Sequence, residues 1–509
     1  MKIRNLILVL FIVSKFVLQY FAINPVYELH RDEFLHLDLG RHLAFGYTSV
    51  PPVTGLISFL IHLLGNSVFW VKFFPALFGA LVILVTWKIV EELNGGLFAL
   101  ILASVCVLLS VFVRINTLYQ PNSLDFLLWT LLLFTIIKYL KTEKNRWIYL
   151  ASVVVGVGLL NKYNIAFLLL GMIPAFLISG KRKIFINKHL YYAAAISLLI
   201  ILPNLVWQYI NDFPVFAHLR TLTDYQLVNV QRSDFLVEQL LYFMNSILII
   251  ILGFISFFTC TEFKKYRVLL FTYIFTITIY VFLRAKSYYP IGLYPAFLAF
   301  GAVYLEGLLS SGWTRYLRIV ALAIPIVVFI PLATLSLPLL PPQEIMEKKE
   351  LFDKFNITRW EDGEIHDLPQ DYADMLGWKE LAEIVDSALT LVDEKDRTIV
   401  HCDNYGQAGA INYYSKEMIT EALSINADYI YWYPLDKFEI KHVILVKDIY
   451  DTDRKRLKEK PVFDNVSLIG EIKNKHARES GTRVYLLRGA RQSINNILRE
   501  EIDDRRSHR

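Results

Sequence analysis

The chain has 509 residues, of which 55% are hydrophobic and 19% are charged, and its formal net charge is +5. The apolar residues stand in long blocks rather than in amphipathic stripes, which excludes a soluble globular protein. The modest positive charge gives no indication of a nucleic-acid partner. These features predict a polytopic α-helical membrane protein.

The apolar blocks are long enough for about eleven membrane spans, because a helix needs about 20 residues to cross the hydrocarbon layer. They lie near 5–24, 68–87, 96–113, 121–140, 147–162, 164–179, 189–210, 237–260, 267–284, 287–305 and 318–340. Lys and Arg cluster in the loops on one side of this topology: Lys2/Arg4, Lys138/Lys141/Lys144/Arg146, Lys181/Arg182/Lys183, Lys264/Lys265/Arg267 and Arg315/Arg318. The positive-inside rule therefore predicts a cytoplasmic N-terminus in the cell membrane, with everything after Pro341 outside.

A change of composition at LPLLPP (337–342) predicts two domains, a membrane domain over 1–340 and an extracytoplasmic domain over 341–509. The second domain combines strand-like and helical patterns, so we expect a small α/β fold. The expected strands are 398–402, 428–433, 442–447 and 482–487, and the expected helices are 376–390 and 406–415. Cys402 is its only cysteine, which excludes an internal disulfide.

An acidic, aromatic and His-rich segment, YELHRDEFLHLDLGRHLAFGYTSVPP (27–52), lies within the outer loop 25–67. A loop this long within a compact bundle is usually functional. Its residues 32–44 predict a short interfacial helix that Pro51 and Pro52 would end. Asp32 at its start has two interpretations, the N-cap of that helix or a general base at the membrane face.

The chain resembles the GT-C superfamily of membrane glycosyltransferases, most closely the protein O-mannosyltransferase-like branch that includes the aminoarabinose transferases. The resemblance rests first on the Asp-Glu pair after the first span, and on the Gly-Tyr and Pro-Pro before the second. It continues through QPNSLDFLLWTLLL (120–133), LLNKYNIAFLLL (159–170), LPNLVWQYINDFPVFAHLR (202–220) and RAKSYYPIGLYPAFLAFGA (284–302). It covers most of residues 5–305.

The resemblance implies an inverting glycosyltransferase that moves a sugar from an undecaprenyl- or dolichyl-phosphate donor to an acceptor hydroxyl on the outer face. The acceptor is a glycan, a lipid or a protein. Asp32 is then the catalytic base, and Glu33 either orients it or binds acceptor or metal.

A phosphate leaving group calls for cations at the outer ends of the spans, where Lys and Arg are otherwise scarce. The cations and the tyrosines beside them that we expect to bind the donor are Lys162, Tyr163, Arg284, Lys286, Tyr288 and Tyr289. The alternative for the cations is snorkelling to lipid headgroups, and for the tyrosines an ordinary interfacial position. His36, His218 and Arg220 are candidates for contact with the acceptor.

The chain departs from the resemblance at one place. The aminoarabinose transferases have an acidic residue and a lysine before the Pro-Pro, where this chain has Ser49 and Val50. The histidines near Asp32 raise the question of a divalent metal, but their spacing matches no closed ligand set, so no cofactor is expected to be required.

Three further alternatives stay open. Many helices with a few intramembrane charges also fit a transporter or flippase of lipid-linked saccharide, although the chain shows no internal repeat. The missing lysine is consistent with an inactive scaffold. The GQAG turn (406–409) is either a phosphate-binding helix start or an ordinary strand-to-helix turn.

Overall fold

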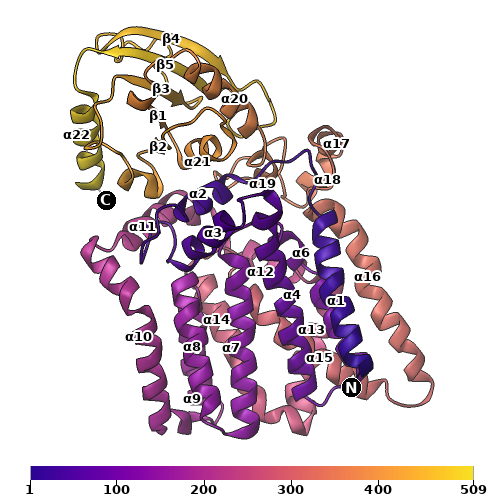
Figure 1. The fold of residues 1–509 in the computed structure, drawn as a ribbon. Coiled ribbons are helices and arrows are strands. Elements are labelled where there is room, and N and C mark those ends of the chain that lie inside the picture. The colour runs from indigo at the N-terminus through magenta and orange to yellow at the C-terminus, as the bar shows by residue number, and fades with distance from the viewer. Residues whose placement is uncertain (1, 508–509) are drawn as a thin grey trace.

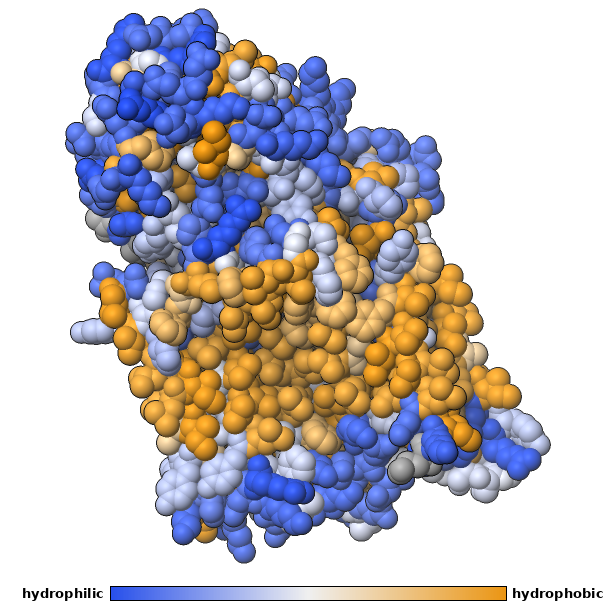
Figure 2. Space-filling model, viewed as in Figure 1, coloured by the Kyte–Doolittle hydropathy of each residue, from blue (hydrophilic) through white to orange (hydrophobic). Residues whose placement is uncertain are grey.

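The computed structural model describes residues 2–507, apart from the side chains of His218, Tyr225 and Ser507. A bundle of long helices forms the lower part of the molecule, and a domain with a sheet lies over one end of it (Figure 1). Figure 2 shows, on the face in view, a belt of hydrophobic residues across the bundle, with hydrophilic surfaces above and below it. The predicted class, a membrane protein with a C-terminal α/β domain, is confirmed.

Within the described residues, seven helical segments are long and apolar enough to cross a membrane, or eight if a pair bent by 56° counts as one span. Every predicted span coincides with a helix, and three of them are the shorter apolar helices α5, α8 and α9. The count of eleven is therefore approximate. The helices of the bundle are α1 (Lys2–Phe21), α4 (Val68–Glu92), α5 (Leu97–Leu108), α7 (Asn122–Thr142), α8 (Arg146–Asn161), α9 (Ile165–Ile178), α10 (Lys188–Ile210), α12 (Arg232–Leu241), α13 (Ile247–Thr259), α14 (Arg267–Phe282), α15 (Tyr294–Leu308) and α16 (Leu317–Ser336).

Short helices occupy the level between the bundle and the upper domain (Figure 1). They include α2 (Arg31–Leu39), α3 (Val53–Leu63), α6 (Phe112–Ile115) and α11 (Pro214–Tyr225). The prediction of one helix over 32–44 is wrong in its extent, because the chain leaves α2 at Gly40 to pass tightly over α3. A Cβ atom at Gly40 would lie 2.6 Å from the backbone of Phe59. Pro52 does not end a helix but is the N-cap of α3.

The C-terminal domain contains one five-stranded mixed sheet in the order β2-β1-β3-β5-β4, with β1 parallel to β2 and β3, and β5 antiparallel to β3 and β4. The strands are β1 (Thr398–Cys402), β2 (Ala422–Ser424), β3 (His442–Lys447), β4 (Phe463–Glu471) and β5 (Arg483–Ala490). The helices are α17 (Pro342–Glu347), α18 (Lys349–Lys354), α19 (Gln370–Ala373), α20 (Trp378–Leu389), α21 (Tyr405–Tyr414) and α22 (Ile494–Ser507).

The strand expected at 428–433 is wrong, since Ala427–Tyr431 form a 3-10 helix. Asp428 bonds to the backbone N–H of Thr48, and Tyr429 bonds to Asp38 of α2. Successive side chains of a strand point to opposite faces, whereas a helical turn allows both side chains to reach the outer loop.

Helix α2 lies between the two halves of the molecule. Phe34 packs edge-on against Trp378 and Tyr414 of the C-terminal domain, with ring centroids 5.7 Å apart in both cases. Gly409 of α21 faces Phe34 so closely that a Cβ atom there would lie 2.6 Å from its side chain. Residues 33–39 of α2 are thus enclosed in an interdomain core rather than exposed at a membrane surface.

Candidate active site

Asp32 lies in the first turn of α2, but it does not cap the helix. The N-cap is His30, whose ring Nδ1 accepts the backbone N–H of Asp32 at 3.2 Å. The N-cap interpretation of Asp32 is therefore wrong. Its carboxylate instead accepts two side-chain hydrogen bonds, from the Tyr405 hydroxyl to Oδ1 at 2.8 Å and from Gln120 Nε2 to Oδ2 at 3.0 Å.

The carboxylate of Asp32 is suited to accept a proton. About a third of the side chain, 34%, is exposed, so a substrate hydroxyl can reach it. Burial raises the pKa of Asp32, but the positive charges of His30 and Arg31 outweigh burial and hold the pKa below its ordinary value. The carboxylate is therefore ionised at neutral pH, as a general base must be.

Glu33 has a different environment from its neighbour. It is fully buried, and both of its carboxylate oxygens accept from the ammonium group of Lys72, at 2.6 and 2.7 Å. The backbone N–H groups of Tyr119 and His30 donate to the same carboxylate at 2.7 and 2.8 Å. With its oxygens engaged in this way, Glu33 fits the orienting role that the sequence left open, because it fixes α2 to α4.

A chain of hydrogen bonds connects Asp32 to Lys162. Gln120, which donates to Asp32, accepts from Asn122 Nδ2 at 2.8 Å, and Asn122 Oδ1 accepts from Lys162 Nζ at 2.7 Å. The Lys162 ammonium lies over the ring of Tyr289 at 4.3 Å and near that of Tyr288 at 5.3 Å. The fold therefore brings the predicted base and three of the predicted donor-binding residues into one polar network.

Lys286 lies beside this network and pairs with Glu361 of the C-terminal domain at 2.6 Å. Burial lowers the pKa of Lys286, but the neighbouring Tyr288 hydroxyl and the Glu361 carboxylate outweigh burial and raise the pKa above its ordinary value, so the ammonium stays charged. Arg284 differs, since its side chain is exposed and makes no hydrogen bond or ion pair within residues 2–507. The fold thus brings Lys286 to the network, but not Arg284.

Tyr163 makes its hydrogen bonds outside this network. Its hydroxyl donates to Asn204 of α10 at 2.7 Å and accepts from Gln208 at 3.2 Å. Asn204 in turn donates to the carbonyl of Phe45. In this structure Tyr163 therefore ties the start of α9 to α10 and to the outer loop.

Neither accessory candidate with a described side chain, His36 or Arg220, makes a hydrogen bond within this network. His36 is buried against the carbonyl of Tyr119 at 3.1 Å, and burial lowers the pKa of its imidazole, which favours the neutral form. Arg220 on α11 is 86% exposed and lies 3.9 Å from Asp224, while the side chain of His218 is outside the described part of the chain. Among the described residues, no three His, Cys, Asp or Glu side chains gather as metal ligands would.

Two comparisons with known proteins find similar proteins. Residues 49–207 match the family model described as dolichyl-phosphate-mannose-protein mannosyltransferase. The fold matches crystal structures of ArnT from Cupriavidus metallidurans. The structure bound to undecaprenyl phosphate is 12% identical and the apo structure 13%, each with a TM-score of 0.64 over 94% of this chain and 97% of the other. The chain is thus similar to this mannosyltransferase family over residues 49–207 and shares the fold of ArnT. None of the curated proteins matches it by sequence.

The position at which this chain departs from the aminoarabinose transferases contacts the C-terminal domain. The hydroxyl of Ser49 donates to Asp428 at 2.7 Å, and the backbone N–H of Thr48 donates to the same carboxylate at 2.6 Å. Ser49 stands where the aminoarabinose transferases have an acidic residue, and here its side chain bonds to the C-terminal domain.

The GQAG turn (406–409) packs against the outer loop. A Cβ atom at Gly406 would lie 3.3 Å from the side chain of Arg31, and Gly409 faces Phe34. Asn404 caps the helix, with its side chain accepting the N–H of Gln407. These contacts favour the structural alternative over phosphate binding.

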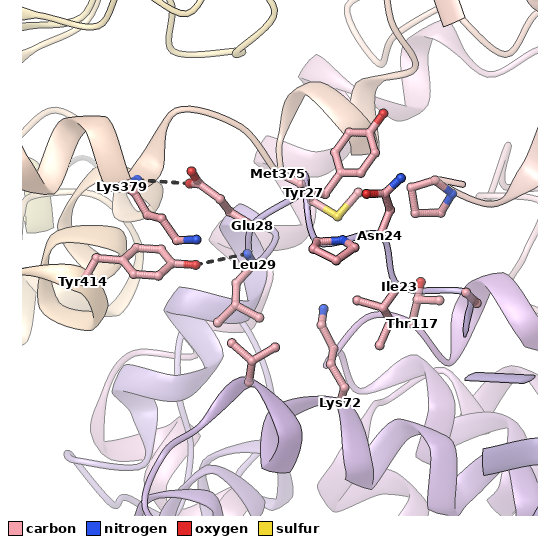
Figure 3. Close-up of a pocket in the computed structure, with 14 residues that line it drawn as sticks. Ile23, Asn24, Tyr27, Glu28, Leu29, Lys72, Thr117, Met375, Lys379 and Tyr414 are labelled. Atoms are coloured by element: carbon pink, nitrogen blue, oxygen red, sulfur yellow. Dashed lines mark hydrogen bonds between the residues drawn. The ribbon is translucent and has the colours of Figure 1, made fainter. Parts of the chain in front are cut away.

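A small cavity lies where α1, α4 and the C-terminal domain meet (Figure 3). It has a volume of about 190 Å³ and includes the ammonium-bearing side chains of Lys72 and Lys379. Glu28 on its wall accepts the backbone N–H of Lys379, and Tyr414 accepts that of Leu29, as Figure 3 shows. At roughly 30 Å³ per water, the cavity holds about six waters, too few for a lipid-linked sugar. Asp32 does not line it, so it is not the donor site.

A larger apolar groove of about 510 Å³ lies between α7, α8, α9 and α10. Its lining is almost entirely aliphatic and aromatic, and it includes Leu159, one helical turn before Lys162. Its chemistry suits a hydrocarbon chain.

Four residues of the network were not singled out from the sequence: Arg31, Gln120, Asn122 and Tyr405. Gln120 and Asn122 stand in the QPNSLDF segment that carries the resemblance, and their polar side chains at the start of a span were an available signal. Tyr405 lies 373 positions from Asp32, and no spacing rule relates residues in separate domains.

Proposed function

We propose that the protein is an inverting glycosyltransferase that moves a sugar from a polyprenyl-phosphate donor to an acceptor hydroxyl at the outer face of the cell membrane. The observation that carries the proposal is the hydrogen-bonded chain from Asp32 to Lys162. It joins an ionised carboxylate to an ammonium group at the outer end of α8. Inverting transfer needs these two groups, one on each side of the anomeric carbon.

The proposed reaction has one displacement step. The acceptor oxygen attacks the anomeric carbon and gives its proton to Asp32, while the bond from that carbon to the phosphate oxygen breaks. The polyprenyl phosphate leaves with the electron pair of that bond, and the ammonium groups of Lys162 and Lys286 stabilise its charge. Each charge-assisted hydrogen bond to the phosphate contributes about 1.5–3 kcal/mol.

The apolar groove supports a polyprenyl donor. It begins one helical turn from Lys162 and continues between α8 and α10, so a phosphate at Lys162 would have its hydrocarbon chain in this groove. The ArnT structure that shares the fold is bound to undecaprenyl phosphate, which favours the same class of donor here.

We infer the orientation from the charges. The clusters of Lys and Arg lie in loops such as α7–α8 and α9–α10, at the end of the bundle opposite α2 (Figure 1). By the positive-inside rule this end and the N-terminus are cytoplasmic, and the C-terminal domain, residues 341–509, is outside. The acceptor is then a glycan, lipid or protein of the outer face.

The scheme takes its positive charge from lysines and includes no cofactor. A chelator tests this directly, because transfer should be unchanged after treatment with EDTA. Loss of transfer on chelation, with recovery on adding Mg²⁺ or Mn²⁺, would add a divalent metal to the site.

The test of the function uses purified protein in nanodiscs with a panel of radiolabelled polyprenyl-phosphate sugars and with lipid, glycan and protein acceptors. We expect one donor to bind and its labelled sugar to appear on an acceptor with inverted anomeric configuration. A donor that binds and crosses between the leaflets of proteoliposomes with its sugar still attached would instead identify a flippase.

A further inference from the structure

Tyr405 is the residue of the C-terminal domain that touches the proposed catalytic carboxylate. It is the first residue of α21, and its hydroxyl donates to Asp32 Oδ1 at 2.8 Å. The guanidinium of Arg31 lies over its ring, 4.7 Å from the centroid. The other oxygen of Asp32 is held from the membrane domain, by Gln120. Each half of the molecule thus holds one oxygen of the base.

The Tyr405 hydroxyl is held in place by contacts on both sides of α21. Gln407 donates to Glu479 within the C-terminal domain at 2.7 Å, and Asn412 donates to Asp38 of α2 at 2.7 Å. Gly409 allows α21 to approach Phe34 of α2 without a side chain between them. A hydrogen-bond donor on a rigid element fixes the orientation of its partner more tightly than one on a loop does.

We propose that Tyr405 is a positioning residue for Asp32, so that the catalytic centre is complete only when the C-terminal domain is docked on α2. This inference rests on the proposed function, in which Asp32 takes the proton of the acceptor. With Oδ1 fixed by Tyr405 and Oδ2 fixed by Gln120, the plane of the carboxylate is set. The free lone pairs of its oxygens then point in defined directions toward the acceptor.

The proposal predicts an effect on the pH dependence of transfer. The charged and titratable groups that act on Asp32 are His30, Arg31, His36, Asp374, Tyr288 and Tyr405. The hydrogen bond from Tyr405 stabilises the ionised form and so lowers the pKa of Asp32. Its removal raises that pKa, which moves the acidic limb of the pH–rate profile to higher pH.

The experiment compares two variants of one helix, Tyr405→Phe and Tyr413→Phe, in the full-length protein. Tyr413 also makes an interdomain hydrogen bond, to the carbonyl of Asn66 at 2.9 Å, but it does not contact Asp32. We expect Tyr405→Phe to lower kcat about tenfold or more at neutral pH, as loss of a hydrogen bond to a charged group does. The KM for the donor should stay unchanged and the acidic limb should move up. Tyr413→Phe should leave kcat and the limb as in the wild type.

Equal effects of the two variants would overturn the inference, and so would a Tyr405→Phe profile that coincides with that of the wild type. If Tyr405→Phe does not fold, incorporation of 3-fluorotyrosine at position 405 keeps the ring and gives a stronger donor, so the acidic limb should move down. An unmoved limb there contradicts the proposal. Absence of transfer by the wild type would instead refute the proposed function itself.

Discussion

The outer loop 25–67 faces the membrane domain on one side and the C-terminal domain on the other, and the two contacts differ in kind. Toward the bundle, the loop depends on a buried ion pair, Glu33 with Lys72, and on the bond from Gln120 to Asp32. Toward the C-terminal domain, the ring of Phe34 packs against aromatic side chains, and polar contacts such as those of Asp38 and Ser49 are spread along the loop. The bundle thus supplies the buried ion pair that anchors α2, while the C-terminal domain covers α2 and completes the site.

The largest effect on stability should come from the bundle side. Glu33→Ala leaves the ammonium of Lys72 and two backbone N–H groups buried without an acceptor, which typically costs about 3–5 kcal/mol. We expect a large fall in the thermal unfolding midpoint in detergent. A double variant, Glu33→Leu with Lys72→Met, should recover part of the loss because it leaves no unpaired charge. An unchanged midpoint in Glu33→Ala would contradict the assignment of Glu33 to structure.

Donor binding should depend on the bundle side as well. Lys162→Ala removes the ammonium at the end of the hydrogen-bonded chain, and we expect donor affinity to fall roughly 10- to 100-fold, as for a lost charge-assisted bond. Lys141→Ala is the matched control, since Lys141 pairs with Glu92 at the opposite end of α7. Titration of a labelled polyprenyl-phosphate sugar measures both. Equal affinities in the two variants would remove Lys162 from the donor site.

On the side of the C-terminal domain, Asp38 should make stability depend on pH. Burial raises the pKa of Asp38 to about 6. A folded-state pKa above the ordinary value means that the folded protein binds the proton more tightly, so stability falls as pH rises from about 4 to about 6. The Asp38→Asn variant has no carboxyl group to ionise, so it avoids this loss of about 1–3 kcal/mol in the free energy of unfolding. The unfolding midpoint of the variant should therefore rise relative to that of the wild type as the pH increases from 4 to 7. A constant difference across that range would show that Asp38 does not titrate.

The smallest effect should come from Ser49. Ser49→Ala removes one hydrogen bond to Asp428, which keeps the backbone N–H groups of Thr48 and Ser49 as donors. We expect a loss of about 1 kcal/mol or less in the free energy of unfolding and no change in donor affinity. A loss as large as that of Glu33→Ala would mean that the domain interface, rather than the bundle, determines the position of α2.

The membrane fold could be predicted from the sequence because each apolar block encodes its own helix. The strands β1, β3 and β5 were predictable for the same reason, since their side chains are buried in continuous runs. Strand β4 was missed because only one of its nine residues is buried, so its sequence is a mixture of polar and apolar residues.

The site was predictable only where a residue type was unusual for its place. Asp32 and Lys162 stood out as charges at the ends of apolar blocks, and the fold connects them. The sequence could not show that Glu33 is the buried structural carboxylate and Asp32 the accessible one. That difference depends on Lys72 and Tyr119, which reach α2 from other parts of the chain. The hydrogen bond from Tyr405 depends on how two domains dock, which no local pattern records.

The most direct test of the account is the transfer rate of Asp32→Asn, measured together with donor binding in the same nanodiscs. Removal of a general base typically lowers the rate by about 10²–10⁴, while the asparagine keeps an oxygen for Tyr405 or Gln120 and leaves donor binding as in the wild type. This account predicts that result. Transfer by Asp32→Asn at a rate near that of the wild type would show that Asp32 is not the base.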